Sequence, residues 1–169
     1  QPTSCSLNPL CGHEIEWALT PLKKKKSLLV IGGGPGGIEA ARVGAERGFD
    51  VTLWEASDRL GGNLWPASKP NFKHDISDYI NYLNNLCQHL PVNILLNKQA
   101  TDADIKNFNA DYVIIATGAE MELPPFGNSN VLTVIDVLNG KMPQGEKILV
   151  IGAGVYGCET AVYLAQQGK

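Results

Sequence analysis

The chain carries the same glycine-rich signature twice, and the two copies are separated by a constant offset of 120 residues. Each copy follows a short apolar run and precedes a helical pattern. The matching positions are Gly32, Gly34, Gly37, Ala41 and Gly48 in the first copy and Gly152, Gly154, Gly157, Ala161 and Gly168 in the second. A single G-x-G-x-x-G is a weak signal, but two copies in the same context favour two dinucleotide-binding units on a parallel α/β sheet.

The first copy has a physical interpretation at each glycine. Residues 27–31 form an apolar run that predicts a buried parallel strand. Gly32 allows the tight turn after that strand, Gly34 leaves room for a pyrophosphate, and Gly37 lets the helix pack closely against the sheet. The start of that helix offers free N–H groups and a positive dipole end to phosphates, and Gly48 ends the helix. The predicted phosphate-binding residues are Gly32, Gly34, Pro35, Gly36 and Gly37.

A carboxylate follows at the end of the second predicted strand, 50–54. Glu55 lies where an acid accepts hydrogen bonds from an adenosine ribose. Arg59 is a candidate phosphate ligand, and the pair Gly61 and Gly62, with Asn63 beside it, suits a second close approach to a cofactor. A plain loop with a glycine cap is the alternative for this pair.

Further elements follow in the α/β order. Strands are predicted at 92–96, 113–116 and 147–151, and helices at 74–89, 102–108 and 134–138. The strand at 113–116 ends in Ala116, Thr117 and Gly118, small residues that let the backbone lie against a ligand; a strand end without a ligand is the alternative. In the second copy, Gly152, Gly154 and Gly157 are the predicted nucleotide-binding residues.

These motifs together resemble flavoproteins with two dinucleotide-binding domains, in which the first unit binds FAD and the second binds NAD(P)H. The N-terminal stretch, which includes Cys5, Asn8 and Pro9, together with 70–76, is similar to the 2,4-dienoyl-CoA reductase and trimethylamine dehydrogenase family of old-yellow-enzyme-type oxidoreductases. The resemblance implies that Cys5 is the last of four ligands to a [4Fe-4S] cluster. It also implies an upstream TIM barrel that binds FMN. Electrons would pass from NAD(P)H through FAD and the cluster to FMN, which reduces an unsaturated substrate.

The predicted organisation has four parts: a linker at 1–26, an FAD-binding Rossmann unit at 27–118, a connector at 119–145, and the start of an NAD(P)-binding unit at 146–169. The second unit stops one residue after Gly168, before the strand whose end would select the nucleotide. We therefore expect this chain to be part of a longer enzyme and to be inactive alone. No residue is a convincing acid, base or nucleophile, so no catalytic residue is named.

The composition limits the other functions. The net charge of −3 argues against nucleic acid as a partner, and the longest apolar runs are too short for a membrane span. Four cysteines without framework spacing favour a reducing compartment, the cytoplasm. Two alternatives stay open: a non-catalytic module that holds ADP, and a simple FAD-dependent reductase. An incomplete unit exposes apolar surface, so we expect its last strand and helix either to dock against the FAD half or to pair with another copy.

Overall fold

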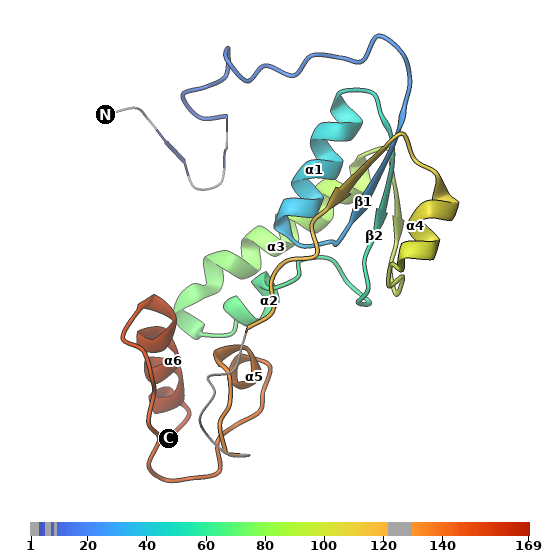
Figure 1. Cartoon of the computed structure of the whole chain (residues 1–169). Coiled ribbons are helices and arrows are strands. Elements are labelled where there is room, and N and C mark those ends of the chain that lie inside the picture. Colours follow the sequence, from blue (N-terminus) through green and yellow to red (C-terminus); the bar gives the residue numbers. More distant parts are fainter. Residues whose placement is uncertain (1–3, 6–7, 9, 122–129) are drawn as a thin grey trace.

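A four-stranded parallel sheet forms the centre of the protein (Figure 1). The computed structural model describes residues 4–5, 8, 10–121 and 130–169. The strand order is β3-β2-β1-β4, and each neighbouring pair is parallel. The strands are β1 (Ser27–Ile31), β2 (Asp50–Trp54), β3 (Val92–Leu95) and β4 (Tyr112–Ile115). The predicted Rossmann-like α/β fold is confirmed, with strand boundaries within one residue of the expectation.

Helices cover both faces of the sheet at β1 and β2, whose side chains are buried on both sides, whereas the residues of the edge strand β4 are exposed. On one face, Leu28 and Val30 pack with Ile38 of α1 (Pro35–Glu46) and Leu83 of α3 (His74–His89). On the other face, Leu29 and Ile31 pack with Trp54, beside α4 (Asp102–Phe108). Successive β1 side chains therefore alternate between two cores, as a strand with a period of two requires.

The loop after β2 contains more structure than the sequence indicated. It forms a short helix, α2 (Leu64–Ala67), and a 3₁₀ turn, η1 (Asn71–Lys73), before α3 begins. Pro66 lies inside α2 and is buried, and Pro70 caps η1. Prolines usually interrupt helices. Here both segments are only one turn long: Pro66 lies in the first turn of α2 and Pro70 precedes η1 as its N-cap, so the missing N–H of each costs no internal hydrogen bond.

The second glycine-rich copy lies beyond the sheet (Figure 1). It contributes α6 (Val155–Gln166), and α5 (Val134–Leu138) packs between α2 and α6. The predicted strand at 147–151 is wrong, because none of these residues joins a ladder, and Leu149 and Ile151 are 84% and 68% exposed. A strand requires a hydrogen-bonded neighbour, and among the described residues none lies beside it. No helix in the described part of the chain is long and apolar enough to cross a membrane.

Candidate dinucleotide-binding site

The turn between β1 and α1 is shaped by glycines that no larger residue could replace. Gly32 has φ of +105°, and a Cβ there would collide with the backbone oxygen of Ala116 at the end of β4. A Cβ at Gly37 would collide with the backbone oxygen of Gly32. Gly32 also donates its N–H to the Trp54 oxygen over 2.7 Å. These contacts fold the turn tightly over the carboxyl ends of the strands, as the sequence predicted.

Gly34, like Gly36, differs from Gly32 and Gly37 because its missing side chain faces open space. A Cβ built there has no other group within 4 Å, and its φ of −73° is accessible to any residue. Gly34 is the N-cap of α1, and its oxygen accepts the first helical bond from Ile38 over 2.9 Å. The residues after Pro35 therefore begin a 12-residue helix, and no other group covers the backbone at its start. This cradle fits a diphosphate, because free N–H groups and a positive helix end attract negative charge there.

Glu55 lies beside this turn, at the carboxyl end of β2. Its Oε2 accepts a hydrogen bond from the Gly33 N–H over 2.5 Å, and its Oε1 accepts bonds from the Ser57 N–H and hydroxyl, each over 2.7 Å. Partial burial opposes its ionisation, but these hydrogen bonds outweigh burial and hold the pKa of Glu55 below its ordinary value. The side chain is therefore a fixed carboxylate at the position where ribose hydroxyls bind in this fold.

Gly61 and Gly62 pack against the glycine turn between β1 and α1. The Gly61 N–H donates to the Gly33 oxygen over 2.8 Å, and a Cβ at Gly62 would lie 3.0 Å from the Gly34 Cα. The guanidinium of Arg59 lies 4.4 Å from the centre of the Trp65 ring. Asn63 and Arg59 are both exposed near the turn. Their contact with a cofactor stays a prediction.

The Ala116–Gly118 segment lies at the same edge as the glycine turn. The Ala116 N–H donates to the Ile31 oxygen over 2.7 Å, which places the end of β4 beside the end of β1. Thr117 and Gly118 follow and are exposed, and Gly118 has φ of +80°. The structure thus brings together three predicted segments, 32–37, Glu55 and 116–118, although they are distant in sequence.

The second glycine turn reproduces the first in its local geometry. Gly152 has φ of +107°, a Cβ at Gly154 would meet open space, and a Cβ at Gly157 would collide with the Gly152 oxygen. Gly154 is the N-cap of α6, as Gly34 is of α1. Both helices also end alike, because the residue after the terminal glycine donates to the carbonyl five residues earlier: Phe49 to Gly44 and Lys169 to Leu164.

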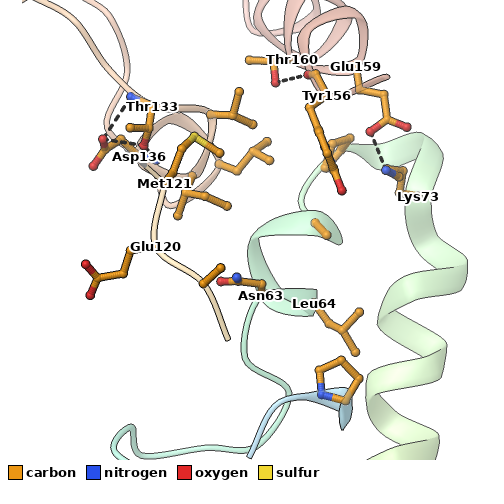
Figure 2. Close-up of a pocket in the computed structure, with 17 residues that line it drawn as sticks. Asn63, Leu64, Lys73, Glu120, Met121, Thr133, Asp136, Tyr156, Glu159 and Thr160 are labelled. Carbon is orange, nitrogen blue, oxygen red and sulfur yellow. Dashed lines mark hydrogen bonds and ion pairs between the residues drawn. The ribbon is translucent and has the colours of Figure 1, made fainter. Parts of the chain in front are cut away.

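A pocket of about 970 Å³ opens between the two copies. Its wall includes the first turns of both glycine-rich helices, at Pro35 and at Tyr156, and Figure 2 shows Asn63 and Tyr156 among the residues that line it. Lys73 and Glu159 face each other across one side. Sequence reasoning missed this pair. The repeat makes Glu159 the counterpart of Glu39, but it does not identify Lys73 as a partner.

Cys5, the predicted cluster ligand, lies at an exposed position in the N-terminal segment. A [4Fe-4S] cluster requires four ligands, usually cysteine thiolates. Within the described residues, no group of three or more His, Cys, Asp or Glu side chains could hold a metal ion. The described residues of this chain therefore do not fit such a cluster by themselves, and the role of Cys5 stays a prediction.

Comparison with known proteins identifies relatives of the whole arrangement. The chain is 44% identical to cinnamate reductase of Clostridium sporogenes over 98% of its length, and 41% identical to metal reductase of Desulforamulus reducens over 99%. It covers 25% and 26% of those proteins. The structure of a 2-naphthoyl-CoA reductase in complex with 2-naphthoyl-CoA matches with a TM-score of 0.91 and 38% identity, over 98% of this chain and 26% of that one.

The chain thus spans about a quarter of the length of the relatives that it matches, and these are named reductases. The resemblance to large flavin-dependent reductases and dehydrogenases is confirmed. The sequence model described as pyridine nucleotide-disulphide oxidoreductase matches residues 26–169. The chain belongs to the pyridine nucleotide-disulphide oxidoreductase family.

Proposed function

We propose that residues 27–118 bind FAD and that residues 146–169 begin an NAD(P)H site, in a flavoprotein that transfers electrons from NAD(P)H. The observation that carries this proposal is the pair of glycine turns with matching geometry, each with an unobstructed glycine at the start of a 12-residue helix. A structural turn has no need for that free space, whereas a diphosphate requires it.

The roles of the residues follow from their positions. The turn at 32–37 binds the diphosphate of FAD through its amides, and Glu55 binds the ribose. Gly61 and Gly62 hold the turn, while Arg59, Asn63 and the 116–118 segment line the path of the cofactor. Gly152, Gly154 and Gly157 do the same for the nicotinamide dinucleotide. Bound FAD supplies the redox chemistry; this chain supplies binding, orientation and electrostatics.

The pocket between the copies is the proposed meeting place of the two ring systems. It adjoins the first turn of α1 and the first turn of α6, where the two diphosphates would lie. Its volume of about 970 Å³ lies within the range of pockets that take cofactor-sized ligands. The wall is largely apolar, with Leu64 and Leu138 among its members, and such a wall would exclude water from around bound cofactors.

The longer protein is proposed to contain an FMN-binding TIM barrel and a [4Fe-4S] cluster with Cys5 as one ligand. The relatives support this proposal through their length, which is about four times that of this chain. The substrate class, an unsaturated compound, is suggested by the names cinnamate reductase and 2-naphthoyl-CoA reductase.

The test is the cofactor content of the purified longer protein. We expect the flavin absorbance bands, and FAD together with FMN in the supernatant after acid denaturation. Bleaching of the bands on addition of NADH or NADPH would show which nucleotide donates. A preparation that releases ADP in place of FAD would overturn the proposal in favour of a non-catalytic nucleotide-binding module.

A further inference from the structure

We infer that the ion pair between Lys73 and Glu159 is a latch that fixes the position of the second glycine turn relative to the first. Lys73 Nζ lies 2.5 Å from a Glu159 carboxylate oxygen, and the two side chains are only 22% and 27% exposed. Among the described residues, it is the one ion pair that joins 27–118 to 146–169. This inference rests on the function proposed above.

The internal repeat provides a comparison for Glu159. Its counterpart Glu39 lies at the same turn of α1 and is bound by Arg42 of the same helix, with contacts of 2.6 and 2.8 Å. The counterpart of Arg42 in the second copy is Val162, which has no charge. Glu159 therefore lacks the local partner that Glu39 has, and its partner comes from the other unit.

Lys73 also has an unfavourable electrostatic position within its own unit. It is the N-cap of α3, and no side chain caps that helix end. A cation at a helix N-terminus is disfavoured, because the helix dipole is positive there. The local structure thus offers Lys73 no stabilising partner, and the carboxylate of Glu159 supplies the compensating charge.

The latch also has the right position to control geometry. Both residues line the pocket between the two copies (Figure 2). Helix α6, which carries Glu159, begins directly after its N-cap Gly154 in the second turn. The other connection between the units runs through α5, which packs on α2 and on α6. Two connections on different sides of one pocket prevent α6 from pivoting about α5. Lys73 and Glu159 are therefore positioning residues, and they act through the placement of the nicotinamide against the flavin.

The experiment compares Glu159→Gln with its matched control Glu39→Gln in the longer flavoprotein. The rate of flavin reduction by NAD(P)H is expected to fall by about 10- to 100-fold in Glu159→Gln, because small displacements of reacting atoms have effects of that size. FAD content and reduction by dithionite, which needs no second turn, are expected to stay unchanged. Glu39→Gln is expected to match the unaltered protein in all three measurements.

Two further variants and one independent measurement complete the test. The charge exchange Lys73→Glu with Glu159→Lys is expected to restore the rate, and Lys73→Arg to preserve it. Amide hydrogen exchange in α6 of the longer flavoprotein is expected to be about two- to fivefold faster in Glu159→Gln, the range of a partly exposed ion pair. Equal rates in Glu159→Gln and Glu39→Gln, or a charge exchange that restores nothing, would overturn the latch. An unaltered protein without FAD would instead overturn the proposed function.

Discussion

Replacement of Gly34 by alanine tests whether the open space beside this residue serves ligand binding or folding. The added Cβ meets no other group within 4 Å, and the backbone angle suits alanine. Restriction of the unfolded chain favours the variant by about 0.4–1 kcal/mol, and the weaker N-cap opposes it by a similar amount. We therefore expect the free energy of unfolding to change by less than about 0.5 kcal/mol. Thermal unfolding followed by circular dichroism measures this change.

Binding of FAD is expected to respond differently to the same substitution. If the diphosphate packs against the Gly34 backbone, the methyl group overfills that contact at a cost of about 1–3 kcal/mol. That cost corresponds to an affinity about 5- to 150-fold weaker. A titration of the flavin-free longer protein with FAD, followed by flavin fluorescence, measures the effect.

Gly37→Ala is the matched control for Gly34→Ala. Its Cβ would collide with the Gly32 backbone oxygen, so it is expected to destabilise the fold by about 2 kcal/mol or more. The two substitutions, three residues apart, are thus expected to have different effects: Gly34→Ala weakens FAD binding, and Gly37→Ala destabilises the fold. An unchanged FAD affinity in a well-folded Gly34→Ala protein would refute the assignment of the cradle.

Three further outcomes are expected. Glu55→Gln is expected to weaken FAD binding about 10- to 150-fold, because a charge-assisted bond to ribose is worth roughly 1.5–3 kcal/mol when lost. Equilibrium titration measures the affinity, and full affinity would contradict the ribose role. Hydrogen bonds from Lys98 and then from the Thr101 hydroxyl lower the pKa of Asp104 to about 2, below that of an unfolded aspartate, so the ionised carboxylate stabilises the fold above about pH 4 and this stabilisation is lost as the pH falls towards 2. Asp104→Asn is therefore expected to flatten the dependence of the melting temperature on pH over that interval, and an unchanged slope would contradict this. Burial raises the pKa of the Cys87 thiol, so alkylation at pH 8 is expected to modify the exposed Cys158 before Cys87. Mass spectrometry follows the two reactions, and equal alkylation rates for the two thiols would show that α3 opens.

The sheet was predictable because its information is local and repeated. A strand such as β1, buried on both faces, shows a continuous apolar run, and the glycines that end it mark the turn. The helix α3 was predicted at its observed bounds, since its buried residues Ile80, Leu83 and Cys87 recur at helical spacing. These elements depend on burial patterns that the sequence itself displays.

The parts that could not be predicted depend on partners distant in the chain. The 147–151 segment has the composition of a strand, but ladder pairing depends on a neighbour that composition does not reveal. The Lys73–Glu159 pair joins residues 86 positions apart, and charge alone does not select one partner among many. The contacts of Gly61 and Gly62 with the first turn were likewise invisible, because a glycine pair suits a ligand and a packed backbone equally well.

The shape of the second glycine turn has a consequence for the residues that it tolerates. Gly152 adopts nearly the same φ as Gly32, although the segment before it belongs to no ladder in the described part of the chain. The bend and its helix therefore keep this local shape although no strand pairs beside residues 147–151 in the described part of the chain. The contact that excludes a Cβ at Gly157 lies within the turn itself, at the Gly152 oxygen, so a larger residue is excluded there whatever packs alongside.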